Sequence, residues 1–182
     1  MNCWKSINIE KDYGSNRLYL MAFLIGIGSF IVLFVPVSMI HGTESVVDKG
    51  IVPFILALIS LPTLHSLTHM IPVLMVGKPI KIKFKTSIKC LPTFHCYSGS
   101  YLSKTLALSS MVLPTIFITI PGLIVSLLMP HIFVYVLAFT AIHIGISLRD
   151  FLYIIHILKA PKMAVVENGT ADLDILIERT KS

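Results

Sequence analysis

Four long apolar stretches follow one another along the chain, and each is long enough to cross a lipid bilayer as a helix. They span residues 18–40, 51–76, 105–129 and 132–158. About 20 apolar residues in a helix cover the roughly 30 Å hydrocarbon layer of a membrane. The first stretch contains no charged residue, and no small-residue cleavage site follows it, so we interpret it as a retained span. The pattern predicts an all-α membrane protein with four transmembrane helices.

A different pattern separates the second and third stretches. Residues Ile80 to Lys85 alternate apolar and basic side chains with a period of two, directly after the turn signal Gly77-Lys78-Pro79. Such alternation is typical of a strand, and its basic face would meet anionic lipid head groups. The alternative is a plain loop whose lysines only enforce topology. We expect a short β element at the membrane surface between the second and third helices.

Composition supports a membrane protein and argues against a soluble one. Hydrophobic residues make up 55% of the chain and charged residues only 13%, whereas ordinary soluble domains have about 25% charged residues. The mean hydropathy is +0.85. These values exclude a water-soluble globular protein and leave the lipid bilayer as the main partner.

The distribution of Lys and Arg predicts the orientation. The net charge is +6, but the basic residues flank the apolar stretches and form no nucleic-acid-binding face. Thirteen of them lie in the N-terminal arm, the loop 77–104 and the tail, and only Lys49 lies in the other loops. Because short positively charged loops stay in the cytoplasm, we expect a multi-pass protein of the cell membrane with both termini cytoplasmic. The domains are then a cytoplasmic arm (1–17), a four-helix transmembrane domain (18–159) and a cytoplasmic tail (160–182).

Cysteine usage predicts no disulfide framework. Cys3, Cys90 and Cys96 are few, odd in number and without CxxC spacing. His95 lies between the last two, but this spacing fits no common metal site. We expect free thiols on the cytoplasmic side.

Three ionisable residues inside the spans are candidates for a metal site. Asp150 is the one carboxylate within an apolar stretch, where ionisable groups are costly and usually face the bundle interior. His65 and His69 are four residues apart, so a helix places both on one face. Counted inward from the predicted cytoplasmic ends at about 1.5 Å per residue, all three lie roughly 12–18 Å deep and can meet. Two imidazoles and one carboxylate form a ligand set of catalytic zinc.

Other interpretations of these residues remain open at this point. The histidine pair is also compatible with hydrogen-bonded packing between helices, or with haem or another cofactor. Asp150 has Arg149 beside it and could form an internal ion pair. A third class of function is a small transporter or accessory subunit in which Asp150 and the histidines conduct protons or cations.

Several motifs in combination resemble a bacterial integral-membrane family of zincin peptidases of unknown function. The resemblance rests on the HSLTH motif at 65–69, the GKPIK segment at 77–81, Phe84-Lys85, the HIGISLRD segment at 143–150 and the KAPK segment at 159–162. That family in turn is similar to the site-2 intramembrane metalloproteases. The resemblance implies that His65, His69 and Asp150 are zinc ligands.

Two departures from the family pattern concern catalysis. The family's helix motif is HExxH, in which glutamate is the general base, but Ser66 stands at that position here. The family's asparagine seven residues before the aspartate is replaced by His143. The sequence therefore predicts a degenerate peptidase that binds a metal or a transmembrane client protein. The alternative is an active peptidase with His143 or His156 as a substitute base.

Overall fold

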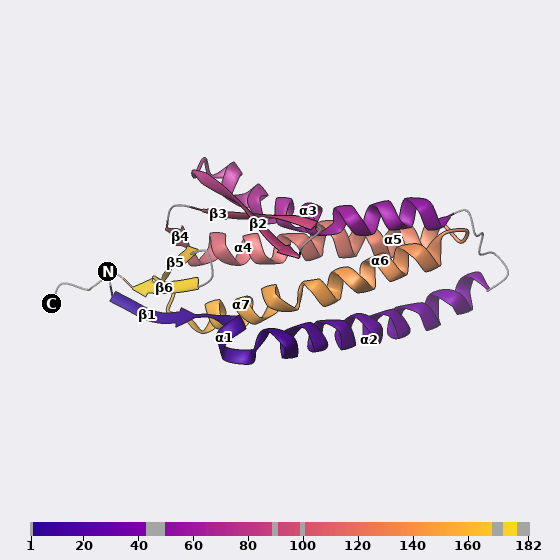
Figure 1. Cartoon of the computed structure of the whole chain (residues 1–182), viewed down its shortest axis with the longest axis horizontal. Helices are drawn as coiled ribbons and strands as arrows, with labels where there is room; N and C mark the ends of the chain where they lie inside the picture. The colour runs from indigo at the N-terminus through magenta and orange to yellow at the C-terminus, as the bar shows by residue number, and fades with distance from the viewer. Residues whose placement is uncertain (1, 43–49, 89–90, 99–100, 169–172, 178–182) are drawn as a thin grey trace.

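The molecule consists of long helices that run side by side, with one group of strands at one end and a second pair of strands beside the helices (Figure 1). The structure is a computed structural model and describes residues 2–42, 50–88, 91–98, 101–168 and 173–177. The helices are α1 (Ile9–Tyr13), α2 (Ser15–His41), α3 (Ile51–Met75), α4 (Lys104–Pro114), the π-helix η3 (Thr115–Thr119), α5 (Ile120–Leu128), α6 (Phe133–Ile146) and α7 (Leu148–Lys159). The chain is thus mostly helical, as expected.

Three helical segments are long and apolar enough to cross a membrane, and a bent pair counts as a possible fourth. The three are α2, α3 and the continuous run from α4 through η3 to α5. The fourth apolar stretch was expected as one span over 132–158. In the structure it breaks at Ser147 into α6 and α7, and the bend between the two helices is 43°. The Ser147 hydroxyl donates to the carbonyl oxygen of His143 at 2.9 Å and helps to end α6 there.

A four-stranded antiparallel sheet joins both ends of the chain, which the all-α prediction omitted. Its order is β1-β6-β5-β4, formed by β1 (Asn2–Ile7), β6 (Leu173–Ile177), β5 (Val165–Asn168) and β4 (Leu102–Ser103). The strands are two to six residues long and come from distant parts of the sequence, so no local periodicity reveals them. The N-terminal arm (1–17) and the tail (160–182) were expected to be separate. Instead, β1 of the arm pairs with β6 of the tail.

The strand expected at Ile80–Lys85 is present as part of a two-stranded antiparallel sheet. It forms the first part of β2 (Ile80–Ile88), which pairs with β3 (Leu91–Ser98). Contact of this sheet with lipid head groups stays a prediction. Cys90, between the two strands, lies outside the described residues, and Cys3 in β1 is a free, exposed thiol.

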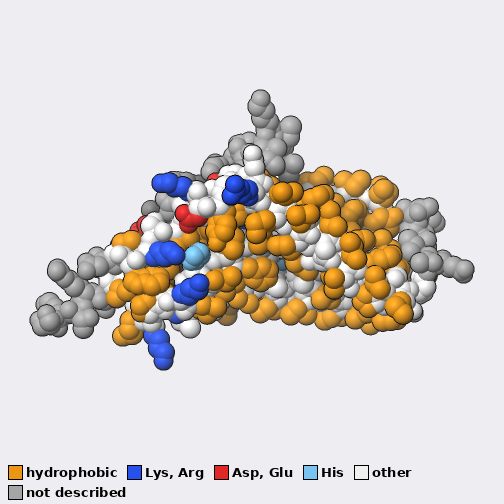
Figure 2. Space-filling view, turned by 90° about the horizontal axis from the view of Figure 1, so that it is seen from below, with side chains coloured by type: hydrophobic (Ala, Val, Ile, Leu, Met, Phe, Trp, Pro, Cys, Tyr) orange, Lys and Arg blue, Asp and Glu red, His pale blue; other side chains and the backbone are white. Residues whose placement is uncertain are grey.

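Most of the closely packed core lies where the sheet meets the helix ends. Ile7 and Ile175 from the sheet are fully buried in one cluster with Ile157 of α7 and Val73 of α3. Along the helices, by contrast, large apolar side chains such as Val32 are exposed. Figure 2 shows Lys and Arg gathered toward the strand end, while hydrophobic side chains cover the rest of that face. This outward apolar surface is what a membrane-associated protein presents to lipid.

Helices α2 and α6 approach each other closely because a glycine lies at their contact. A Cβ atom at Gly145 would lie 2.5 Å from the backbone oxygen of Ala22. At Gly26, on the opposite helix, an added Cβ would find its nearest neighbour, the Ala141 oxygen, at the ordinary distance of 3.5 Å. The helix pair therefore has no room for a Cβ atom at Gly145 but has room for one at Gly26.

We predict that Gly145→Ala destabilises the protein by about 1–3 kcal/mol, because the backbones of α2 and α6 must separate to accept the new methyl group. Gly26→Ala is the matched control and should leave stability close to that of the wild type. Thermal unfolding of both variants in detergent measures the difference. Equal stability of the two variants would contradict the close packing at Gly145.

Candidate metal centre

His65, His69 and Asp150 meet between α3 and α7. Each offers one ligand atom, and these atoms all lie within 4.8 Å of one another. His65 Nε2 is 3.2 Å from Asp150 Oδ2, and His69 Nε2 is 3.4 Å from Asp150 Oδ1. The two Nε2 atoms are 3.2 Å apart. The structure thus brings together the three residues that the sequence singled out as candidate ligands.

The local backbone explains how the three side chains converge. His65 and His69 project from one face of α3 because they are one helical turn apart. The break at Ser147 starts a new helix, and Asp150 lies in the first turn of α7. A carboxylate is favoured in the first turn because backbone N–H groups and the helix dipole point toward it.

The centre is largely buried and contains an oxygen without a hydrogen bond. The side chains of His65, His69 and Asp150 are 12%, 20% and 11% exposed. Among the described residues, Asp150 Oδ2 has no hydrogen-bond partner, although His65 Nε2 is only 3.2 Å away. A buried carboxylate oxygen without a partner is costly. A cation between these nitrogen and oxygen atoms would remove that cost, so the donor set fits a metal ion such as zinc.

Ser110 of α4 forms hydrogen bonds with both the ring and the backbone of His69. His69 Nδ1 donates to the Ser110 carbonyl oxygen at 2.8 Å, and the Ser110 hydroxyl donates to the His69 carbonyl oxygen at 2.6 Å. A carbonyl oxygen only accepts hydrogen bonds, so Nδ1 must carry the proton. In the neutral ring the lone pair is then on Nε2, which faces the centre. A backbone carbonyl on the outer nitrogen is a common arrangement for metal-binding histidines.

His65 contacts a second histidine through its outer nitrogen. His65 Nδ1 lies 3.1 Å from Nε2 of His143, and Nδ1 of His143 lies 3.0 Å from the Thr119 hydroxyl. His143 is fully buried. Thr119 ends the π-helix η3, a distortion that is frequent at functional sites. His143 therefore contacts Nδ1 of His65, whereas the other ring nitrogen of His65, Nε2, is the one that faces Asp150 and His69.

The remaining candidate residues have other surroundings. Arg149 pairs with Glu10 at 3.0 Å and lies over the ring of Tyr19, so its ion-pair partner is not the adjacent Asp150. His156 lies 3.3 Å from Lys5 Nζ at the strand end. Ser66 follows His65 in α3 and is half-buried.

Sequence reasoning missed Ser110 and Thr119 as partners of the histidines. Both are small polar residues in an apolar stretch, which is a weak signal because such residues are common in transmembrane helices. They are nine apart, and at about 100° per residue a regular α-helix would place them on opposite faces. The π-helix η3, which ends at Thr119, has wider turns than an α-helix and therefore changes the angle between the two side chains around the helix axis. Regular periodicity therefore could not assign both residues to one site.

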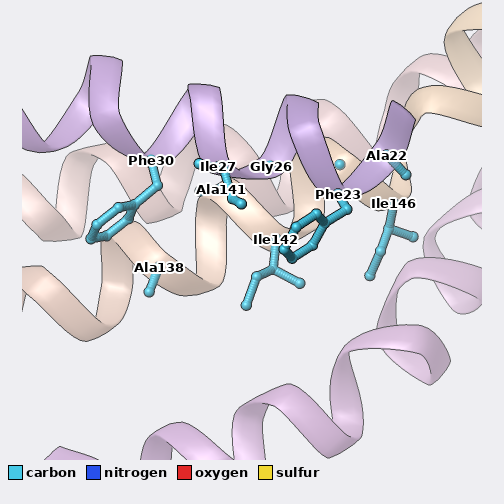
Figure 3. A pocket seen from close by; sticks show the side chains of 10 residues that line it. Ala22, Phe23, Gly26, Ile27, Phe30, Ala138, Ala141, Ile142 and Ile146 are labelled. Atoms are coloured by element: carbon cyan, nitrogen blue, oxygen red, sulfur yellow. The ribbon is translucent and has the colours of Figure 1, made fainter. Parts of the chain in front are cut away.

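A separate hollow lies between α2 and α6 (Figure 3). It has a volume of about 380 Å³ and is lined only by apolar residues and glycines. Phe23 and Phe30 of α2 and Ile142 and Ile146 of α6 border it. It contains no ionisable side chain and belongs to a different face of α6 from His143.

Comparison with known proteins identifies one similar family. The family described as "Putative zincin peptidase" matches residues 58–165, which is more than half of the chain. The matched range includes His65, His69 and Asp150. The match confirms the resemblance drawn from the sequence motifs. Searches of the curated proteins and of the solved structures found no match.

Proposed function

The chain belongs to this zincin-peptidase family, and we propose that it is a membrane protein that binds zinc through His65, His69 and Asp150 but has lost peptidase activity. The observation that carries the metal site is the convergence of these three ligand atoms, with the Asp150 Oδ2 atom buried and without a hydrogen bond to any described residue. The observation that carries the loss of activity is Ser66 at the position of the family's general base.

The chain's own residues are suited to hold such an ion. His69 presents Nε2 because Ser110 occupies its other nitrogen, and Asp150 supplies oxygens from the first turn of α7. Bound zinc supplies a Lewis acid that polarises carbonyl groups and lowers the pKa of water. Two histidines and one carboxylate leave one position of a tetrahedral ion for another ligand. A peptide carbonyl from a transmembrane client protein is the partner we propose there.

Among the residues that the structure describes, none near the centre replaces the missing base. The hydroxyl of Ser66 is not basic near neutral pH, and loss of a general base typically lowers a rate by about 10²–10⁴-fold. His143 is a poor substitute because both of its ring nitrogens face protein partners and its side chain is buried. His156 is directed to Lys5 at the strand end. These contacts favour a pseudopeptidase over an active enzyme with a substitute base.

We further propose that α2, α3, the α4–α5 run and the bent α6–α7 pair each cross the cell membrane once, with both termini in the cytoplasm. The four-stranded sheet supports this arrangement, because it gathers β1, the strand before α4 and the two strands after α7 at one end. An even number of crossings returns the chain to that end. The excess of Lys and Arg in the same segments supports the cytoplasmic side.

We predict that the purified wild-type protein retains one equivalent of zinc after zinc-supplemented preparation and desalting. His65→Ala combined with His69→Ala should release most of it, because two of the three ligands are lost. His156→Ala is the control, since it removes a histidine outside the centre and should leave the metal content unchanged. Mass spectrometry of the metal content measures all three. Zinc-free wild type, or full retention in the double variant, would refute the metal site.

We predict that the unmodified protein does not cleave a membrane-tethered reporter and that Ser66→Glu raises cleavage. The new carboxylate would leave α3 next to His65, where the family carries its base, and would add general-base catalysis worth about 10²–10⁴-fold. Adding His65→Ala to this variant should abolish the gain. Ser66→Gln is the matched control, because it has the same size but no basic carboxylate. Zinc-dependent cleavage by the unmodified protein would overturn the pseudopeptidase proposal.

We predict that an impermeant maleimide added to intact cells labels His131→Cys but not Met163→Cys, each in a background where the native cysteines are serine. His131 lies in the turn between α5 and α6, and Met163 lies between α7 and β5; both side chains are exposed. Both should be labelled after the cells are permeabilised. Labelling of Met163→Cys alone in intact cells would reverse the proposed orientation.

A further inference from the structure

We propose that His143 is a positioning residue of the metal centre: with a metal bound, it accepts the Nδ1 proton of His65 and donates its own Nδ1 proton to Thr119, so that His65 binds the metal through Nε2. This inference rests on the zinc site proposed above and adds a role for a residue outside the ligand set. Its basis is the line of contacts from Thr119 Oγ1 to His143 Nδ1 at 3.0 Å, and from His143 Nε2 to His65 Nδ1 at 3.1 Å.

The two metal-binding histidines differ in how their protons are placed. At His69 the partner is a carbonyl oxygen, which can only accept, so the proton is fixed on Nδ1. At His65 the partner is another imidazole, whose nitrogen either donates or accepts. The tautomer of His65 is therefore coupled to that of His143, which is coupled in turn to the direction of the hydrogen bond between His143 and Thr119.

The line of hydrogen bonds from Thr119 through His143 to His65 can run in two internally consistent directions. In the first, His65 Nδ1 donates to His143 Nε2, and His143 Nδ1 donates to the Thr119 hydroxyl. His65 Nε2 then has a free lone pair and can bind a metal. In the second, Thr119 donates to His143 Nδ1, His143 Nε2 donates to His65 Nδ1, and the proton on His65 Nε2 faces His69 Nε2 and Asp150 Oδ2, each 3.2 Å away. This second direction makes a metal-free, hydrogen-bonded pair, which is the packing interpretation of the two histidines.

The surroundings of His143 hold it in place for this role. Its side chain is fully buried, and Thr119 is 8% exposed. The Ser147 hydroxyl lies 3.5 Å from His143 Nε2 but donates to the His143 backbone oxygen at 2.9 Å. His65 is thus the favoured partner of Nε2. Such outer partners orient metal-binding imidazoles, and their loss typically weakens metal binding by about 10–100-fold.

The test compares two variants of the full-length protein in detergent. His143→Leu has no acceptor for the His65 proton, whereas His143→Gln can place its side-chain oxygen near the former Nε2 position. Zinc affinity is measured by competition with a chromophoric chelator. His143→Leu should bind zinc about 10–100-fold more weakly than the wild type, and His143→Gln should restore most of the affinity. Thr119→Val leaves all histidines in place and should weaken binding less than His143→Leu does.

Several results would overturn the inference while the proposed zinc site stands. One is unchanged affinity in His143→Leu, and another is equal loss in the Leu and Gln variants, which would indicate a packing role only. ¹⁵N NMR of labelled histidines gives an independent readout. The zinc-bound wild type should show His65 protonated at Nδ1, and metal coordination at Nδ1 would also overturn the inference. A wild type that binds no zinc would instead refute the proposed function and remove the basis of the inference.

Discussion

Asp150 carries a carboxylate into the interior of an apolar helix bundle, and the surrounding structure compensates for it. Asp150 lies in the first turn of α7, where the helix dipole favours a carboxylate, and two imidazoles of α3 approach its oxygens. The break at Ser147 is what gives Asp150 this position, because the new helix begins at Leu148, two residues before Asp150. Among the described residues, one carboxylate oxygen of Asp150 still has no hydrogen bond partner. A bound cation is the simplest completion of this arrangement.

The candidate ligands could be predicted from the sequence, but their outer partners could not. Spacing placed His65 and His69 on one face, and depth in the apolar stretches brought Asp150 to the same level. Assigning His143 requires the direction of its two ring nitrogens, which depends on packing between α3, α6 and η3. The sequence left His143 as a possible base, whereas its contacts place it next to the outer nitrogen of His65, a candidate ligand.

The long helices and one strand could be predicted from the sequence, but the bend in the last apolar stretch and the terminal sheet could not. Apolar length identified the four helical stretches, and alternation identified the strand at Ile80–Lys85. The bend at Ser147 was missed because the apolar residues before and after it together have the length of one span. The terminal sheet was missed because its strands are short and pair across almost the whole chain, as in β1 with β6. It closes the strand end of the bundle and holds α2, α4 and α7 in their relative positions.

We propose that two imidazoles and one carboxylate coordinate zinc in this protein. X-ray absorption at the zinc edge, on the purified wild type, tests it most directly. We expect nitrogen and oxygen neighbours of the zinc at about 2.0–2.2 Å, with scattering from two imidazole rings at longer distances and no sulfur at about 2.3 Å. A sulfur neighbour would assign the metal to cysteines and contradict this coordination, as would scattering without any imidazole contribution.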